Sequence, residues 1–281
     1  MKIKTIRGLW GMAEPSLQKN LEKIKQGGFD GVEMGAPKTA HERQELKAML
    51  RDLQLELVGQ QWSGVFSNVG VDEHIACFKE QFKNNAELGC VFINSHTGKD
   101  YFSLADNIKI FKAGESFAQS MGVKLVHEIH RGRATFSTLS TMALCEALPA
   151  VRFTADFSHW CCVHESFLED QASAMQTAIS KADYIHARVG HSQGPQIPDP
   201  RAPEWAQALE HHLGWWDAIV NLKISQKQSE FYLCPEFGPY PYMTHLPLGN
   251  VPITNLWDVN LYMKKLLLER YSGKSMCPPT I

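Results

Sequence analysis

Short runs of hydrophobic residues alternate along this chain with longer stretches in which apolar residues recur every three or four positions. A short apolar run between turn residues is typical of a buried β-strand, and the longer period is typical of an amphipathic helix. Residues 38–53 show the helical period through Leu46, Met49, Leu50 and Leu53. The pattern therefore predicts strands and helices in alternation.

Eight such strand–helix units follow one another. The strands are expected at residues 3–9, 30–34, 55–60, 90–95, 124–129, 151–157, 183–189 and 231–237. The helices are expected at 16–26, 38–53, 71–88, 104–120, 135–147, 165–181, 204–228 and 255–271. Alternating units imply a parallel sheet covered by helices, and eight units in about 250 residues match a closed (β/α)8 TIM barrel. We predict a single domain of this α/β class over residues 1–281. An open doubly wound sheet is the alternative, but no G-x-G-x-x-G motif follows the first strand.

The charge and composition of the chain narrow the function. Its 281 residues include 28 Lys and Arg and 30 Asp and Glu, a formal charge of −2, whereas dedicated nucleic-acid binders usually carry a basic excess. The chain has no stretch of 18 apolar residues, so no membrane span is expected, and the N-terminus lacks the apolar core of a signal peptide. The seven cysteines form no CxxC pair, which indicates reduced thiols. We expect a cytoplasmic protein.

Four polar residues occur where successive strands end, which is where TIM barrels place their active sites. Glu128, Asp156, His186 and Glu236 belong to the fifth, sixth, seventh and eighth strands. Three carboxylates so close would raise one another's pKa unless a cation neutralised them. Oxygen ligands with one imidazole suit Mn²⁺, Mg²⁺, Co²⁺ or Fe²⁺, with Zn²⁺ as a further candidate. Each residue alone could be a helix cap, an ion-pair partner or a core hydrogen-bonding group, but together they predict one divalent metal ion.

Six short motifs appear in order at these strands: GFDGVEM on the second, NSHTG on the fourth, HEIH on the fifth, DFSH on the sixth, IHARVG on the seventh and PEFG on the eighth. In this order and spacing, over almost the whole chain, they resemble the xylose isomerase-like TIM-barrel superfamily. This is the sugar phosphate isomerase/epimerase group, which also contains endonuclease IV (AP endonuclease family 2). The resemblance implies that Glu128, Asp156, His186 and Glu236 hold the metal ion. It also implies that Glu128 and Glu236 act as an acid/base pair on opposite faces of a substrate.

This chemistry predicts a divalent-metal-dependent isomerase or epimerase of a small sugar or polyol carbonyl compound. A metal ion bridging the carbonyl and a neighbouring hydroxyl stabilises an enediolate, and a base and an acid on opposite faces move the proton. The predicted partner is therefore a small carbohydrate.

Two further polar residues follow the predicted ligands closely. His159 completes a D-x-x-H pattern that the resemblance assigns to contact with a substrate oxygen; a hydrogen bond within the loop is the alternative. Arg188 lies two residues after His186, on the same side of the strand. It could hold a substrate oxygen, or it could pair with Asp156 or another carboxylate.

The ends of other strands supply further substrate-binding candidates. His96 ends the fourth strand and could contact substrate, bind a second metal ion or support another ligand. Trp10 and Trp62 end the first and third strands and could form apolar walls for a sugar, or only pack. His130 and Arg131 lie close in sequence to Glu128, and Arg131 or Arg133 could meet an anionic group, although surface solvation is the commoner fate of such arginines. Trp215-Trp216 packs either a helix or a homo-oligomer contact.

The match to the ketose 3-epimerases of the superfamily is incomplete. A second glutamate that they carry after the fifth strand is replaced here by HRGRAT. They also carry an arginine in the loop after the seventh-strand histidine, whereas the loop here reads VGHSQGPQIPDPR and has different chemistry. A metal-dependent lyase or dehydratase on a keto-sugar, keto-glycoside or cyclitol is therefore the alternative function. Endonuclease IV-like DNA repair is disfavoured because Asp199-Pro200-Arg201 stands where that family has D-x-H. A sugar-binding barrel without activity is disfavoured because both glutamates are present.

Overall fold

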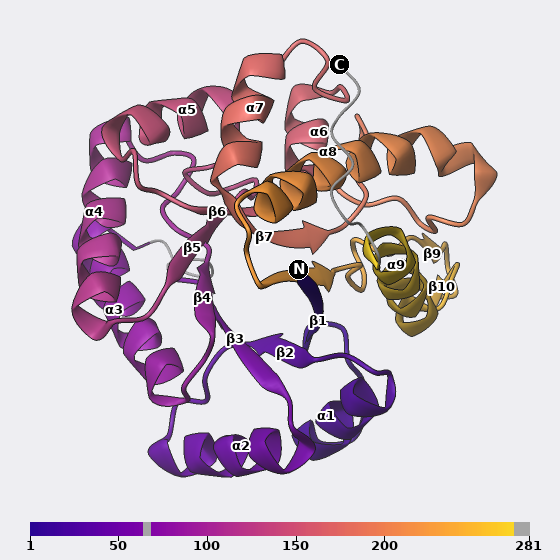
Figure 1. Ribbon diagram of the computed structural model, residues 1–281, viewed down its shortest axis with the longest axis horizontal. Helices are drawn as coiled ribbons and strands as arrows, with labels where there is room; N and C mark the ends of the chain where they lie inside the picture. Colours follow the sequence, from indigo (N-terminus) through magenta and orange to yellow (C-terminus); the bar gives the residue numbers. More distant parts are fainter. Residues whose placement is uncertain (64–68, 273–281) are drawn as a thin grey trace.

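A closed ring of eight parallel strands forms the centre of the computed structural model, which describes residues 1–63 and 69–272. Each strand pairs with the next along the chain, and the last pairs with the first, with Thr5 opposite Leu233. Figure 1 shows the helices arranged around this ring. The predicted single-domain TIM barrel is therefore confirmed. The strands are β1 (Lys2–Gly8), β2 (Gly31–Met34), β3 (Glu56–Gln61), β4 (Phe92–Ser95), β5 (Leu125–Glu128), β6 (Phe153–Ala155), β7 (Ala182–Ala187) and β8 (Glu230–Pro235).

The helices begin where short polar side chains can cap them. The side chains of Ser16, Thr39, Ser103, Ser137 and Asn255 each accept a hydrogen bond from a backbone N–H of the first helical turn, which fixes those starts. The helices are α1 (Leu17–Gln26), α2 (Ala40–Leu53), α3 (Val71–Glu87), α4 (Leu104–Met121), α5 (Thr138–Ala147), α6 (Ser158–His164), α7 (Ala172–Lys181), α8 (Ala206–Ser225) and α9 (Leu256–Tyr271). A 3₁₀ turn (Pro203–Trp205) precedes α8, and a small hairpin of β9 (His245–Leu246) and β10 (Val251–Pro252) precedes α9.

The helix predicted at 165–181 is wrong in its first half. A short helix, α6, begins at Ser158, shortly after the end of β6, and ends at His164. The next helix, α7, starts only at Ala172. Between them Glu165 and Leu168 adopt left-handed backbone conformations, with φ of 51° and 64°. Such residues interrupt a right-handed helix. The small β9–β10 hairpin was not predicted. The Trp215-Trp216 pair packs a helix: Trp216 is fully buried, and the Trp215 ring lies 5.8 Å from that of Phe157.

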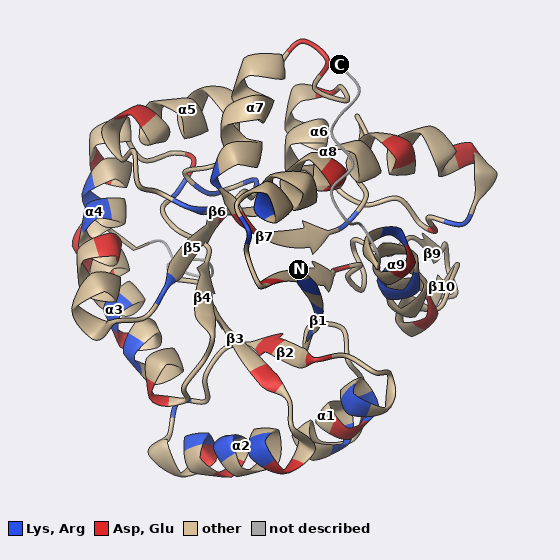
Figure 2. Ribbon diagram, in the orientation of Figure 1, with Lys and Arg blue, Asp and Glu red and all other residues tan. Residues whose placement is uncertain are grey.

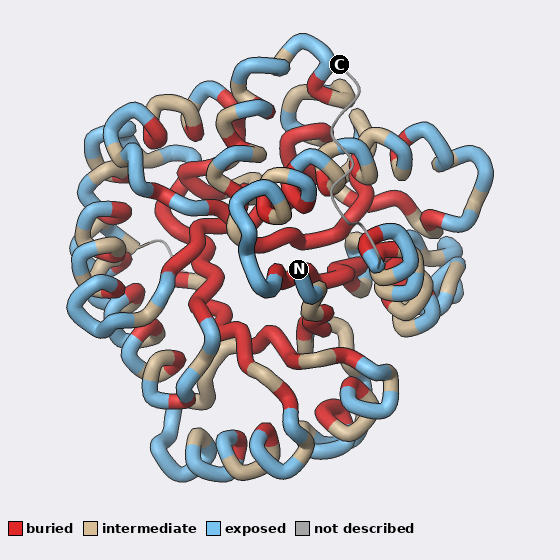
Figure 3. The backbone as a smooth tube through the Cα atoms, in the orientation of Figure 1, coloured by how far each residue is buried: buried red, intermediate tan, exposed pale blue. Residues whose placement is uncertain are grey.

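Apolar side chains fill one half of the barrel interior. The ring of Phe92 packs edge-on against those of Tyr184 and Tyr232, with centroid distances of 5.0 and 5.5 Å. Other apolar clusters lie between the strands and the surrounding helices. Figure 3 shows this as a buried ring of strands inside partly exposed helices. The interior is therefore a packed core below the carboxyl ends of the strands.

Polar residues follow these apolar ones on the same inward face. Side chains of a strand alternate between its two faces, so residues two apart share a face. Tyr184 is thus followed by His186 and then by Arg188, and Phe92 is followed by Asn94 and then by His96. This alternation stacks polar layers on an apolar floor and places them towards the carboxyl ends of the strands.

The described cysteines are free thiols, and Cys277 lies outside the described residues. Among the helices of the described ranges, none has the length and apolar character needed to cross a membrane.

Packing of Phe92, Tyr184 and Tyr232, the apolar floor of the barrel, predicts that a substitution there destabilises the protein more than one at the surface. Replacing Phe92 by Ala removes the ring that both tyrosines contact, and we expect the free energy of unfolding to fall by about 3–5 kcal/mol in urea denaturation. The control Leu139→Ala changes a side chain that is 82% exposed, and it should alter that free energy by less than about 0.5 kcal/mol. Equal effects of the two substitutions would contradict this view of the floor.

Candidate metal centre

Four ligand-type side chains meet above this floor. Glu128 ends β5, Asp156 directly follows β6, His186 lies on β7 and Glu236 directly follows β8. All are buried, and one ligand atom from each lies within 4.8 Å of the others. The Nδ1 atom of His186 is 2.8 Å from Glu236 Oε2 and 3.6 Å from Glu128 Oε2. The structure therefore brings together the four residues that the sequence analysis grouped.

The chain itself supplies a cation to this cluster. Arg188 Nη2 donates to Asp156 Oδ2 at 2.6 Å and to Glu236 Oε2 at 2.7 Å, and Arg188 Nε donates to the same Asp156 oxygen at 3.1 Å. Of the two roles open for Arg188, the structure shows the pairing with carboxylates. Mutual repulsion of the carboxylates is thus partly relieved without a metal ion.

A carboxylate that the sequence analysis did not select fixes His186. Glu33 on β2 places Oε2 2.9 Å from His186 Nε2, and the same oxygen accepts a hydrogen bond of 2.8 Å from the Tyr184 hydroxyl. With Nε2–H directed at Glu33, the other ring nitrogen, Nδ1, faces the Glu128 and Glu236 carboxylates. That nitrogen lies 2.8 Å from Glu236 Oε2 but forms no hydrogen bond of acceptable geometry with it. Metal-binding histidines commonly use one nitrogen for a carboxylate and the other for the ion, so the imidazole fits a metal ligand.

Asn94 on β4 ties Glu33 to the cluster. Its Nδ2 atom donates to Glu33 Oε1 at 2.8 Å and to Glu128 Oε2 at 2.7 Å, and its Oδ1 accepts from the Thr154 hydroxyl at 2.7 Å. Asp156 is held in turn by the Ser158 backbone N–H, 3.2 Å from Oδ1. The ligand-type groups are thus oriented by their neighbours before any ion binds.

A signal for Glu33 and Asn94 was present in the sequence. Each is a polar residue inside a short strand of otherwise largely apolar residues, GVEM and FINS. Since the outer face of a barrel strand packs under helices, a buried polar side chain in such a strand is expected to face the interior.

The electrostatics of the cluster couple its members. Burial would lower the pKa of His186, but Glu236, Glu33 and Glu128 outweigh burial and raise it well above its usual value. Burial would raise the pKa of Glu128, but the imidazoles of His96 and His186 hold it well below its usual value. Burial raises the pKa of Asp156 to about 6 against the opposing effect of Arg188. This buried His/Glu/Asp cluster is consistent with a divalent metal site.

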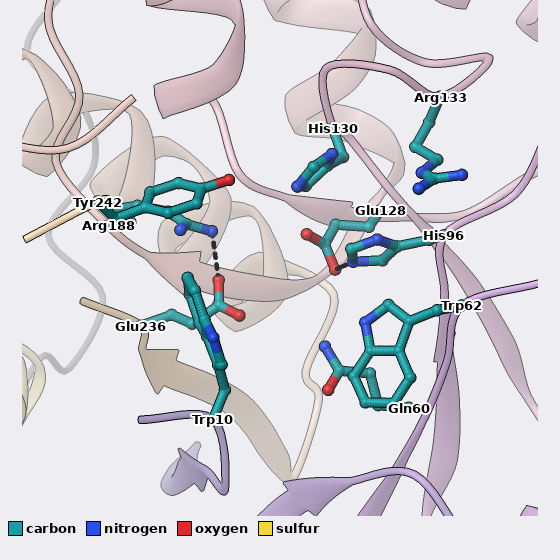
Figure 4. A pocket seen from close by; sticks show the side chains of 10 residues that line it. All are labelled: Trp10, Gln60, Trp62, His96, Glu128, His130, Arg133, Arg188, Glu236 and Tyr242. Carbon is teal, nitrogen blue, oxygen red and sulfur yellow. Dashed lines mark hydrogen bonds and ion pairs between the residues drawn. The ribbon is translucent and has the colours of Figure 1, made fainter. Parts of the chain in front are cut away.

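A cavity of about 320 Å³ opens onto the cluster, and Glu128 and Glu236 both line it. Figure 4 shows Trp10 and Trp62, two of the predicted substrate contacts, on different sides of this cavity. The remaining lining residues are Gln60, His96, His130, Arg133, Arg188 and Tyr242. Tyr242 was not predicted, because it lies in the irregular segment after β8. Its ring centroid is 4.7 Å from the Arg188 guanidinium and 5.1 Å from the Trp10 ring.

Three histidines pack beside Glu128, of which His96 and His130 line the cavity and His159 does not. His96 Nε2 is 2.9 Å from Glu128 Oε2, and His96, Glu128 and His130 form a second group of potential ligands. The His159 ring lies 3.9 Å from the His130 ring and is fully buried, with neither ring nitrogen hydrogen-bonded. Its Nε2 lies 3.5 Å from Asp156 Oδ2. Contact of His96, His159, Trp10 and Trp62 with a substrate stays a prediction.

A family model described as Xylose isomerase-like TIM barrel matches residues 21–212. The chain therefore belongs to this family, and the resemblance found in the sequence is confirmed. A comparison with curated proteins finds no significant match.

Solved structures with the same fold carry the names of enzymes that catalyse different reactions. The D-allulose 3-epimerase from Methylomonas sp., in complex with D-allulose, has 14% identity and a TM-score of 0.65, over 96% of this chain and 98% of that one. The probable 3-DHS dehydratase AsbF from Bacillus anthracis has 16% identity and a TM-score of 0.62, over 95% and 99%. Endonuclease IV from Thermus thermophilus has 14% identity and a TM-score of 0.60, over 95% and 99%. At these identities the likeness shows the fold alone, so the reaction must be argued from the site.

Metal binding at this cluster should release a proton. Its neighbours raise the pKa of His186 well above its usual value and so favour a proton on the ring, which must leave before the imidazole can act as a ligand. We expect Mn²⁺ affinity to rise by about tenfold per pH unit below that raised pKa. Calorimetry in two buffers of different ionisation enthalpy measures the released proton directly. An affinity that does not change with pH, with no proton released, would contradict the assignment of His186.

Glu33 predicts a second effect on metal affinity. Replacing Glu33 by Gln keeps the size of the side chain and removes the charge that orients His186, so Mn²⁺ affinity should fall by about 10- to 100-fold in calorimetric titration. Glu45→Gln, on the exposed side of α2, is the matched control and should leave the affinity unchanged. An unchanged affinity of the Glu33 variant would show that this carboxylate does not support the site.

Proposed function

We propose that this protein is a divalent-metal-dependent isomerase or epimerase of a small sugar or polyol carbonyl compound. The observation that carries the proposal is the position of Glu128 and Glu236. Both belong to the ligand cluster and both line the same cavity, where Figure 4 shows them approaching from different sides. One bound molecule can therefore meet a carboxylate on each of two faces.

In this proposal Glu128, Asp156, His186 and Glu236 hold the metal ion. When bound, a divalent cation supplies Lewis-acid polarisation of a carbonyl oxygen and its neighbouring hydroxyl. The donor set supports this, since three carboxylates and one imidazole suit Mn²⁺, Mg²⁺, Co²⁺, Fe²⁺ or Zn²⁺. Arg188 donates to Asp156 and Glu236, so it would stabilise these two carboxylates alongside a bound ion.

The chain's own groups perform the proton transfer. Glu128 is kept ionised by His96 and His186 and accepts a hydrogen bond from Asn94, so it can take a proton from the carbon next to the carbonyl. Glu236 faces the substrate from the other side and completes the acid/base pair. Epimerisation needs a carboxylate on each face of the substrate, whereas isomerisation on one face needs only a single carboxylate. Trp10 and Trp62 pack against the substrate and exclude water.

Elimination by a lyase or dehydratase is the second candidate, because it begins with the same proton removal. The observation that favours it is His130, a further imidazole in the cavity wall beside Glu128. Its Nδ1–H donates to the Arg131 carbonyl oxygen, which leaves the Nε2 lone pair as a second proton acceptor beside Glu128.

Two observations support a small-molecule substrate over DNA. Lys and Arg are interspersed with Asp and Glu on the outer helices in Figure 2. Asp199, which the sequence analysis compared with an endonuclease IV motif, is paired with Arg201 at 2.6 Å and with Thr254 at 2.9 Å. A duplex needs phosphate contacts from a run of cations.

The test follows solvent deuterium in D₂O with Mn²⁺-loaded protein and a panel of keto-sugars and 3-keto-glycosides. We expect deuterium to enter at least one substrate without loss of a leaving group. Glu128→Gln and Glu236→Gln should each slow this exchange by at least about 100-fold, because each removes one member of the acid/base pair. Glu45→Gln is the matched control and should exchange at the wild-type rate.

Release of water or of an aglycone would identify elimination instead of isomerisation. A Glu236→Gln protein that keeps full metal content and full exchange would refute the role given to Glu236. Circular dichroism and the unfolding temperature establish that each variant is folded.

A further inference from the structure

One cation in the cavity wall takes no part in the cluster. Arg133 belongs to the loop between β5 and α5, and its backbone N–H donates to the His130 carbonyl oxygen at 3.2 Å. The residue is only 5% exposed, yet its side chain lines the cavity. In Figure 4 it lies on the side of His96 and Trp62, away from Arg188 and Glu236.

The guanidinium of Arg133 has unused donors. Its Nε and Nη1 atoms are buried and form no hydrogen bond, and within residues 1–63 and 69–272 no carboxylate forms an ion pair with it. Arg188 differs, because it pairs with Asp156 and Glu236. A buried guanidinium carries a permanent charge and five N–H groups, so leaving its donors unpaired is costly unless a ligand supplies acceptors.

The charges around this wall are of both signs: burial lowers the pKa of Arg133, and Glu128, Asp100 and Tyr101 oppose that shift. The carboxylate that lies towards Arg133 inside the cavity is Glu128, which already accepts a hydrogen bond from Asn94 and stands 2.9 Å from His96 Nε2. Asp100 is exposed. Lys99 is buried close to the guanidinium, and its pKa is lowered first by burial and then by the charge of Arg133. The unpaired Nε and Nη1 donors of Arg133, rather than a net positive charge, therefore suit this wall to a negatively charged group.

We propose that Arg133 binds an anionic group of the substrate, a carboxylate or a phosphate ester, at the end of the cavity away from Arg188. The planar fork of a guanidinium matches two oxygens of either group. This inference deepens the proposed function, on which it rests for calling the ligand a substrate. It narrows the substrates to sugar acids or sugar phosphates and makes Arg133 the residue that selects them over neutral sugars.

The experiment compares charged and neutral probes that are otherwise alike. Calorimetry measures the binding of 5-keto-D-gluconate against L-sorbose, and of D-fructose 6-phosphate against D-fructose, to the full chain with and without Mn²⁺. We expect at least one charged probe to bind about 10- to 100-fold tighter than its neutral counterpart. The first pair detects a carboxylate site and the second a phosphate site.

Variants assign this preference to Arg133. Arg133→Gln should reduce it to less than about twofold, Arg133→Lys should retain part of it, and Arg51→Gln, at the exposed end of α2, should retain all of it. Unfolding temperature and Mn²⁺ content establish that the variants are folded. The inference is overturned if no charged probe binds better than its neutral counterpart, or if the preference survives in Arg133→Gln.

Deuterium exchange in the same Mn²⁺-loaded samples tests the proposed function separately. A preference that depends on Arg133, with no exchange in any probe, supports the anion site and counts against the reaction. Exchange that proceeds equally with charged and neutral probes supports the reaction and overturns the anion site.

Discussion

Neutralisation of buried carboxylates is the constraint on which this site depends. Glu33, Glu128, Asp156 and Glu236 lie together at one end of the barrel, where burial disfavours their charged forms. Arg188 bridges two of them, and Glu236, Glu33 and Glu128 raise the pKa of His186 well above its usual value. These two groups leave an excess of negative charge, which makes a divalent cation a natural occupant of the cluster.

The barrel makes this concentration of charge tolerable through alternation along its strands. Phe92, Tyr184 and Tyr232 form an apolar floor, and the next inward positions carry groups that hydrogen-bond one another. Asn94 connects Glu33 with Glu128, and Glu33 in turn orients His186. Ligand-type side chains are therefore fixed from below, while the cavity above them stays open to a small molecule. Arg133, outside this network, gives the cavity a second charged end.

Regular features of the chain made the fold predictable. Short apolar runs and helical patterns located each of the eight strands and most of the helices, and the motifs identified the family. Glu128, Asp156, His186 and Glu236 could be selected because each marks a strand end. Glu33 and Asn94 were missed because a single polar residue within a short strand does not reveal its partner 61 positions away. Tyr242 and the break at Glu165 depend on irregular backbone, which no periodic pattern describes.

The arrangement of Arg188 also required the structure. Its position two residues after His186 fixed its face of the strand, but only the fold shows that Asp156 and Glu236 both reach it. The most direct measurement is a crystal structure of the Mn²⁺-loaded protein with anomalous scattering at the manganese edge. One manganese peak within coordination distance of Glu128, Asp156, His186 and Glu236 is the predicted result. A cluster that stays free of manganese at saturating Mn²⁺, or an ion bound at the other end of the barrel, would contradict it.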